Sequence, residues 1–202
     1  MGEELVRENG PASLFDADAM AMTLWFSSDL HFDHANLVTN RPDKPASRPQ
    51  FGSVQEMGEF IVNEHNKIVK PNDYWYCLGD VAMAKHSVEW VKRMNGHRRL
   101  VMGNHDVHGH ELYLECFEKI MAFREFDGMM FTHAPVAPWS HRWTVNVHGH
   151  CHRARPLFYS AADPTIQGFS KALNYINLSM EHTGYRPVTL EQIKMWARTQ
   201  RS

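Results

Sequence analysis

The sequence lacks several features that would place it in common protein classes. Its 202 residues include only three cysteines, an odd number without zinc-finger spacing, which favours a reducing compartment. Lys and Arg number 21 against 23 Asp and Glu, so there is no basic excess to grip duplex nucleic acid. No apolar run approaches the ~20 residues of a membrane span, and residues 1–22 contain no signal-type apolar core. We expect a cytoplasmic protein, or one of the host cytoplasm if the source is viral.

Histidine is unusually frequent, at 14 residues, roughly three times its average usage. Five of these histidines lie in short motifs that follow apolar, β-rich runs. The motifs are Asp29-Leu30-His31, Gly79-Asp80, Gly103-Asn104-His105-Asp106, Thr132-His133 and Gly149-His150-Cys151-His152. Residues two apart in extended backbone point to one face, so Asp29 and His31 are expected to share a cavity, as are His150 and His152. The neighbouring glycines allow sharp turns and a close approach of the backbone.

The charge of this residue set favours a phosphate ligand. We expect an inner shell made of Asp29, His31, Asp80, Asn104, His133, His150 and His152. Two divalent ions would then meet two carboxylates, and with a bridging hydroxide the cluster keeps about one positive charge. Mixed imidazole and carboxylate ligands suit Mn, Fe, Zn, Ni or Co better than Ca or Mg. We expect two such divalent ions, with Mn the first choice in vitro.

The order D-x-H, G-D, G-N-H-D, T-H and G-H-x-H resembles that of the calcineurin-like metallophosphoesterase superfamily, from about Leu24 to about Pro187. The resemblance implies an α/β fold, a four-layer αββα sandwich with a dinuclear metal site at the strand ends. It implies hydrolysis of phosphate esters by a hydroxide that bridges the metals and attacks phosphorus. The implied ligands of the first metal are Asp29, His31 and His152, and those of the second are Asn104, His133 and His150, with Asp80 bridging both.

The resemblance also implies that His105 contacts the substrate phosphate or protonates the leaving oxygen. Such a role suits a histidine that titrates near neutrality. Asp106 either orients His105 as part of the catalytic site or caps a helix expected over residues 110–121, and the sequence favours the cap. His34 and His148 adjoin the ligand pairs and are expected to hold the ligands through hydrogen bonds.

Two features of the sequence indicate the substrate class: the residues after Gly79-Asp80, which differ from those of protein phosphatases, and the polar residues of two loops. Protein phosphatases of the superfamily carry Asp-Arg-Gly after the Gly-Asp motif, whereas this chain reads Gly79-Asp80-Val81-Ala82-Met83 and lacks the arginine for a monoester dianion. We therefore expect a phosphodiesterase for small diesters, cyclic nucleotides included. Expected substrate contacts are Arg41 and Arg48, in a proline-rich loop over residues 40–52, and His141 and Arg142. The alternative is that these four are solvated loop residues.

Other functions remain open on the same metal centre. They are a phosphomonoesterase, a nuclease and a dinucleotide polyphosphate hydrolase. A different class is a non-catalytic protein-binding scaffold, like a retromer subunit that shares the fold but has lost the catalytic histidine. An exposed apolar patch without bound metal would favour that scaffold. The expected partner is a small phosphate ester, with no membrane and no duplex nucleic acid; the sequence does not fix the oligomeric state.

The chain alternates between strands and helices, as a layered α/β domain does. We expect strands over residues 24–28, 74–78, 99–102, 129–132, 144–148 and 173–178. Helices are expected over residues 54–69, 86–94, 110–121 and 189–198, with capping boxes at Ser53/Glu56 and Thr189/Gln192. Residues 1–22 are expected to form a flexible extension, and residues 23–202 a single metallophosphoesterase domain.

Overall fold

The computed structural model describes residues 22–137, 143–161 and 173–199. The extension expected over residues 1–22 therefore lies outside the described residues, apart from Met22. Within the described ranges, no helix combines the length and apolarity needed to cross a bilayer.

Two five-stranded sheets form the centre of the molecule. The first has the order β10-β1-β2-β3-β4, with β1 to β4 parallel and β10 antiparallel at the edge. Its strands are β1 (Leu24–Ser27), β2 (Tyr74–Cys77), β3 (His97–Val101), β4 (Lys119–Met121) and β10 (Val188–Thr189). In the register, Phe26 of β1 faces Tyr76 of β2, and Cys77 of β2 faces Leu100 of β3.

The second sheet has the order β5-β6-β7-β9-β8, with the three central strands parallel and both edge strands antiparallel. Its strands are β5 (Arg124–Phe126), β6 (Met129–Phe131), β7 (Val145–His148), β8 (Phe158–Ala161) and β9 (Leu173–Asn177). Parallel strands place their carboxyl ends at one edge, so both sheets can contribute side chains to a common site there.

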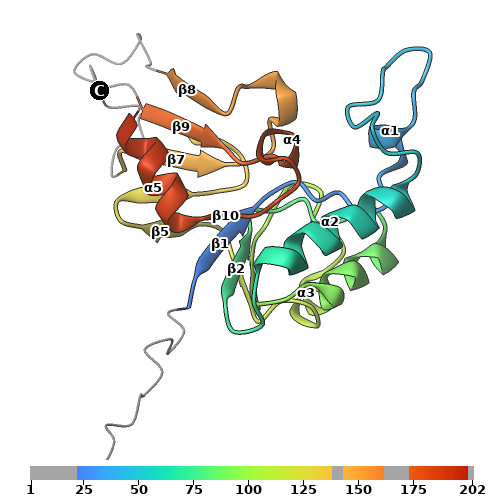
Figure 1. Ribbon diagram of the computed structural model, residues 1–202, viewed down its shortest axis with the longest axis horizontal. Helices are drawn as coiled ribbons and strands as arrows, with labels where there is room; N and C mark the ends of the chain where they lie inside the picture. The colour runs from blue at the N-terminus through green and yellow to red at the C-terminus, as the bar shows by residue number, and fades with distance from the viewer. Residues whose placement is uncertain (1–21, 138–142, 162–172, 200–202) are drawn as a thin grey trace, which may run out of the picture.

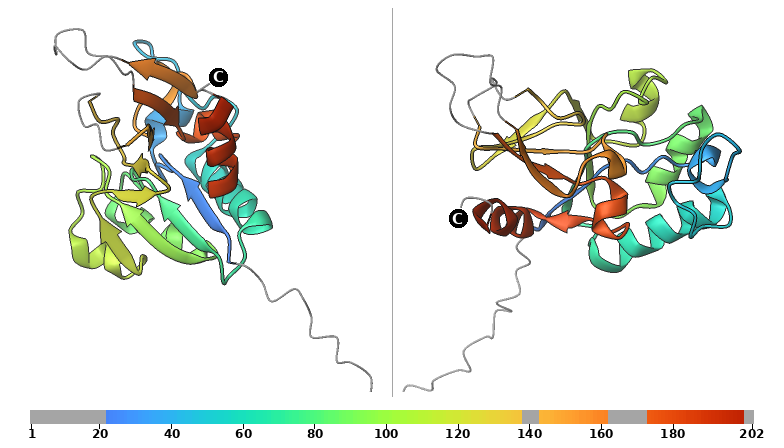
Figure 2. Two further views of the ribbon diagram at one scale, coloured as in Figure 1. Left: turned by 90° about the vertical axis from the view of Figure 1, so that its left-hand side faces the viewer. Right: turned by 90° about the horizontal axis from the view of Figure 1, so that it is seen from above.

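Helices flank the sheets, as the expected sandwich requires (Figures 1 and 2). They are α1 (Ala35–Val38), α2 (Val54–Ile68), the 3₁₀ helix η1 (Lys85–Arg93), α3 (His110–Leu114), the 3₁₀ turn η2 (His152–Ala154), α4 (Met180–Thr183) and α5 (Leu190–Thr199). The helices α2, η1 and α3 cover the first sheet on the side away from the second. Helix α5 packs against β1, β9 and β10.

Alternation along the strands produces two cores. Along β2, Trp75 points toward the helices, and Tyr76 points toward the second sheet. The inner core between the sheets also contains Phe26 of β1, stacked on Phe131 of β6 with ring centroids 4.5 Å apart. Each fully buried large apolar side chain contributes about 1.5–3 kcal/mol. These two cores fix the strand ends, on which the candidate site is built.

The prediction of a helix over residues 110–121 was wrong for the second half of that range. Helix α3 ends at Leu114, and residues 119–121 form the edge strand β4 instead. The amide of Glu118 donates to the carbonyl of Arg98 at 2.9 Å, which draws the chain alongside β3. Sheet pairing therefore overrides the local helical pattern. Residues 85–93 also differ from expectation, because they form a 3₁₀ helix rather than an α-helix.

Both predicted capping boxes lie at helix starts. The hydroxyl of Ser53 accepts from the amide of Glu56 at 3.0 Å, but the Glu56 carboxylate accepts from the amide of Gly52 rather than from Ser53. At α5, Thr189 and Gln192 exchange both bonds, at 2.8 and 3.1 Å. Reciprocal capping satisfies amides that have no partner within the helix.

Candidate metal centre

The motif residues follow the carboxyl ends of five strands from both sheets. Asp29 and His31 come after β1, Asp80 after β2, Asn104 and His105 after β3, His133 after β6, and His150 and His152 after β7. Two groups of three have ligand atoms within 4.8 Å of one another. They are Asp29, His31 and His152, called here the first group, and Asp80, His133 and His150, the second group.

The backbone at these positions differs from the extended form that the i, i+2 argument assumed. Asp29, His31, Asp80, His150 and His152 have positive φ angles, of 60°, 52°, 56°, 67° and 42°. Left-handed backbone is unfavourable for residues with a Cβ, and such strain gathers at functional sites. The paired side chains converge because the backbone turns tightly between them. The expectation that they share one face of extended backbone was therefore wrong.

Glycine at position 149 allows these turns to approach one another. A Cβ on Gly149 would overlap the Ser28 hydroxyl and the Asp29 carboxylate. Instead, the amide of His150 donates to both carboxylate oxygens of Asp29 at 3.0 Å. The strand-end glycine expected here is therefore required by close packing against an acidic side chain.

In the first group, a hydrogen bond to a residue outside the group directs the Nε2 atom of His152 inward. His152 donates from Nδ1 to Glu181 Oε1 at 2.9 Å, which leaves its Nε2 as an acceptor. That Nε2 lies 3.2 Å from His31 Nε2 and 3.6 Å from Asp29 Oδ1. Burial alone would lower the pKa of His152, but its hydrogen bond to Glu181 and the charge of Asp29 raise it. Burial lowers the pKa of His31 well below its ordinary value.

In the second group, His133 is oriented in the same way. His133 donates from Nδ1 to the carbonyl of Leu78 at 2.7 Å, so its Nε2 also carries a lone pair. This Nε2 lies 3.3 Å from Asp80 Oδ2 and 2.9 Å from Asn104 Oδ1. Nδ1 of His150 lies 3.2 Å from the same nitrogen and 2.7 Å from the same oxygen.

These converging acceptors fit a divalent cation. Lone pairs of imidazole and carboxylate repel one another unless a proton or a metal ion lies between them. Burial would lower the pKa of His133, but its hydrogen bond to Asp80 and the charge of Asp29 raise it overall. Nitrogen and oxygen donors of this type, oriented by outer hydrogen bonds, are those of transition-metal sites.

Asp80 belongs to the second group and also faces the first. Its Oδ2 lies 3.5 Å from His31 Nε2 and 3.3 Å from His133 Nε2, while its Oδ1 accepts from the amide of His105 at 2.9 Å. Burial raises the pKa of this carboxyl, but hydrogen bonds from His133 and the His105 amide hold it below its ordinary value overall. One carboxylate therefore faces both candidate metal positions.

Asp106 does not cap helix α3, contrary to the sequence preference. The residue before α3 is Gly109, and no side chain caps that helix. The Asp106 carboxylate accepts from three amides, those of Asp80 at 2.9 Å, Val81 at 2.9 Å and Gly103 at 2.8 Å. It thus joins the turn after β2 to the turn after β3, and this excludes the helix-cap alternative.

Arg48 is placed differently from the exposed substrate contact that the sequence predicted. Its side chain is 0% exposed and forms an ion pair with Glu181 at 2.8 Å. It also donates to the carbonyls of Asp29 at 2.6 Å and Leu30 at 3.0 Å. Burial against the backbone of the first group excludes direct substrate contact and makes Arg48 a positioning residue. Hydrogen bonds from His152 and Arg48 lower the pKa of Glu181 to about 2, against the effect of burial.

The remaining sequence-predicted residues lie in several places. Arg41 is exposed and paired with Asp43 at 3.1 Å. His141 and Arg142 lie outside the described residues. His148 is buried on β7 and bonds to the Gly149 carbonyl at 2.7 Å and to the Tyr159 hydroxyl at 2.9 Å, so it contacts the turn before His150 rather than a ligand side chain.

An open pocket of about 550 Å³ lies over both groups. Its lining includes His31, Asp80, His105, His150 and His152 from the centre. It also includes His34, whose ring centroid lies 5.2 Å from that of His31 and 6.4 Å from that of His105. Burial lowers the pKa of His34 to about 4, and the charges of His105, Arg48, His152 and Lys44 act in the same direction.

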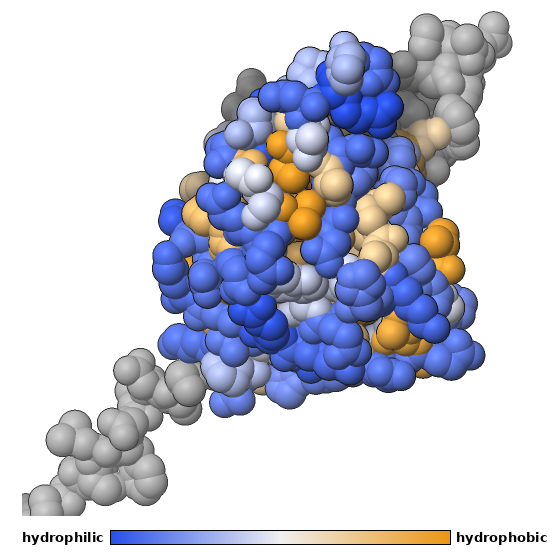
Figure 3. All heavy atoms as spheres, turned by 90° about the vertical axis from the view of Figure 1, so that its right-hand side faces the viewer, coloured by the Kyte–Doolittle hydropathy of each residue, from blue (hydrophilic) through white to orange (hydrophobic). Residues whose placement is uncertain are grey.

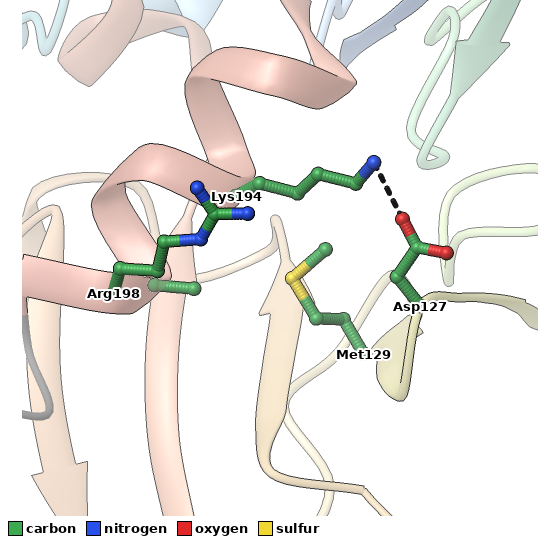
Figure 4. Close-up of a pocket in the computed structure, with 5 residues that line it drawn as sticks. Asp127, Met129, Lys194 and Arg198 are labelled. Carbon is green, nitrogen blue, oxygen red and sulfur yellow. Dashed lines mark ion pairs between the residues drawn. The ribbon is translucent and has the colours of Figure 1, made fainter.

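A second pocket, of about 270 Å³, lies between the β5–β6 turn and α5 (Figure 4). Lys194 in its lining is paired with Asp127 at 2.6 Å and with Glu191 at 2.8 Å. Because its acidic group is already neutralised, this pocket offers no comparable metal site.

The fold and the candidate centre define an α/β protein with carboxylate and imidazole donors at its strand ends. The family model of the calcineurin-like phosphoesterases matches residues 22–192, so the chain belongs to this family. Membership supports metal-dependent hydrolysis of phosphate esters, and the family generally binds two divalent metals.

Two individual proteins and one solved structure are also similar to this chain. The uncharacterized protein MJ1445 of Methanocaldococcus jannaschii is 30% identical over 181 residues, which cover 84% of this chain and 88% of that protein. The gene 66 protein of Mycobacterium phage L5 is 29% identical over 89 residues, 41% of this chain and 39% of that protein. A solved structure, the protein of unknown function AQ665 from Aquifex aeolicus, matches with a TM-score of 0.61 and 22% identity, covering 87% of this chain and all of that chain, and shows the fold alone.

Proposed function

We propose that this protein is a dinuclear metallophosphoesterase that hydrolyses small phosphodiesters, cyclic nucleotides included. The observation that carries the proposal is the position of Asp80 Oδ2, 3.5 Å from His31 Nε2 and 3.3 Å from His133 Nε2. A carboxylate that faces two donor groups suits a bridging ligand. Asp29, His31 and His152 would hold one metal ion, and Asn104, His133 and His150 the other.

Two divalent ions, when bound, supply Lewis acidity and an activated water at neutral pH. The chain's own residues supply the orientation. Glu181 and the Leu78 carbonyl fix the imidazoles of His152 and His133, so that their Nε2 atoms face the centre. Asp106 joins the turns that carry Asp80 and His105.

His105 is the proposed acid for the leaving oxygen. Its amide is tied to Asp80 at 2.9 Å, and it lines the pocket with its ring centroid 5.4 Å from that of His31. It belongs to neither donor group, so its ring is free to deliver a proton. Protonation matters most for an alkoxide, which is a poor leaving group, and is typically worth about 10²–10⁴-fold in rate.

The charge of the pocket favours diesters over monoesters. Lys44 is the single Lys or Arg among the pocket-lining residues that the structure describes. The turn after Asp80 continues with Val81 and Ala82, both fully buried, and lacks the Asp-Arg-Gly of the protein phosphatases. A diester monoanion needs less compensating charge than a monoester dianion.

The test compares Mn-loaded wild type, Asp80→Asn and His105→Ala on bis(4-nitrophenyl) phosphate, 4-nitrophenyl phosphate and a 2′,3′-cyclic nucleotide. We expect diester turnover that is lost with chelator and in Asp80→Asn, while the exposed-carboxylate control Asp43→Asn retains it. His105→Ala should slow the cyclic nucleotide about 100-fold more than the aryl diester, because 4-nitrophenolate leaves without a proton. Monoester preference would overturn the substrate class, and no turnover with two metals bound would favour the scaffold.

A further inference from the structure

The pocket over the metal centre continues beyond the donor residues. Its far wall contains Leu37 of α1 together with Lys44 and Ser47 from the loop that leads toward α2. This loop extends at the side of the molecule where α1 lies, on the right of Figure 1. The proposed hydrolysis assigns no contact with the cleaved phosphate to that wall.

Two polar side-chain atoms on this side of the pocket have no hydrogen-bond partner. The Ser47 hydroxyl and His34 Nδ1 are buried atoms without a hydrogen-bond partner. Buried polar atoms are normally paired, so such exceptions call for an explanation. Lys44 forms no ion pair within the described ranges of the chain, whereas Arg41, three residues earlier, is neutralised by Asp43.

The position of Lys44 separates it from the metal donors. It is close enough for its charge to act on His34, and His34 belongs to neither donor group. The loop that carries it is held by backbone hydrogen bonds between Arg41 and Lys44, at 3.0 and 3.2 Å. Figure 3, which shows this side of the molecule, has a largely hydrophilic surface with hydrophobic residues only in small groups.

We propose that Lys44, Ser47 and His34 form a subsite for a second phosphate of the substrate, remote from the phosphate that is cleaved. This rests on the proposed function and narrows it to nucleoside phosphodiesters that carry an additional phosphate. The pocket of about 550 Å³ falls within the roughly 300–1,000 Å³ typical of small-molecule sites. The Lys44 ammonium group would donate to the second phosphate, and the Ser47 hydroxyl would donate to it after rotation of its side chain, while the His34 ring lines the pocket beside them.

The test uses two substrates that differ only in the remote phosphate. They are thymidine 3′-(4-nitrophenyl phosphate) and the same compound with a 5′-phosphate. For Mn-loaded wild type, we expect the 5′-phosphate to lower KM about 10-fold, as one charge-assisted contact does, and to leave kcat nearly unchanged. Lys44→Met should abolish this preference, and Ser47→Ala should reduce it. Lys85→Met, at an exposed lysine outside the pocket, is the matched control and should retain it.

Calorimetry tests this subsite independently of the proposed reaction, because it measures binding without turnover. Thymidine 3′,5′-bisphosphate should bind Mn-loaded wild type about 10-fold more tightly than thymidine 3′-phosphate, and Lys44→Met should bind both alike. If neither nitrophenyl ester is hydrolysed but calorimetry shows this difference, the subsite stands and the proposed hydrolysis fails. If Lys44→Met keeps the wild-type preference in KM and in binding, or if wild type shows none, the subsite is disproved.

Discussion

Glu181 Oε1 lies 2.9 Å from Nδ1 of His152 and 2.8 Å from Nε of Arg48. One buried carboxylate oxygen therefore links a candidate metal ligand to the guanidinium that holds the Asp29 and Leu30 carbonyls. Imidazole ligands depend on such partners for their tautomer, orientation and basicity. The first group is thus built around the Arg48–Glu181 pair, which lies outside all of the recognised motifs.

Replacing Glu181 with glutamine should weaken metal binding at the first group alone. The variant loses the charge that orients His152 and leaves the Arg48 guanidinium buried without its counter-ion, so Mn affinity there should fall about 10–100-fold. Calorimetric titration of the chelator-treated protein should show one weakened and one unchanged site. The control is Glu64→Gln, which alters a carboxylate paired with Arg186 away from the pocket. Equal weakening of both sites, or of neither, would contradict the role assigned to Glu181.

Arg48 and Glu181 also show which part of the site could not be predicted from the sequence. The motifs predicted the strand ends, because ligand residues after apolar runs are local patterns. Arg48 and Glu181 are 133 positions apart and belong to no motif. Arg48 lies in a proline-rich stretch that resembles a solvated loop, yet it is buried. The left-handed backbone at Asp29 and His152 was likewise unpredictable, because it depends on contacts between distant turns.

Asp106→Asn should destabilise the protein rather than remove a catalytic group. The carboxylate accepts from the amides of Asp80, Val81 and Gly103, and an amide side chain would turn its NH₂ toward at least one of these donors. A buried donor left unpaired costs about 1–3 kcal/mol. Urea unfolding should show this loss, while Asp43→Asn, which alters an exposed ion pair, should change stability by no more than about 0.5 kcal/mol. Unchanged stability in Asp106→Asn would refute the role of Asp106 as a link between the two turns.

Gly149→Ala should disrupt the first group. The added methyl would overlap Ser28 and the carboxylate of Asp29, so one of the two turns must move. We expect one metal per chain instead of two, measured by elemental analysis, and a loss of about 2–4 kcal/mol in stability. Gly52→Ala is the matched control, because the nearest neighbour of its added methyl is the flexible end of Glu56 at 3.1 Å. Two bound metals in Gly149→Ala would show that the turns can separate without harm.

His65 should make stability depend on pH independently of the metal centre. It is 1% exposed on α2, packs edge-on against Trp75, and its Nε2 bonds to the Asn95 carbonyl at 2.9 Å. Burial lowers its pKa from 6.5 to about 4, against the weaker effect of that hydrogen bond. Below pH 6.5 the unfolded chain therefore binds a proton that the folded chain does not, so stability falls with falling pH until about pH 4, where the folded chain also binds it.

The measurement is the free energy of unfolding in urea, at several pH values between 7 and 4, for chelator-treated wild type and His65→Gln. Glutamine can donate to the Asn95 carbonyl but does not titrate. Each pKa unit corresponds to about 1.4 kcal/mol, so wild type should lose up to about 3 kcal/mol more than the variant over this range. Subtracting the two curves removes the titration of the site histidines and the carboxylates, which both proteins share. His110→Gln, at an exposed histidine, should follow wild type. Parallel curves for wild type and His65→Gln would show that His65 accepts its proton in the folded protein as readily as in the unfolded chain.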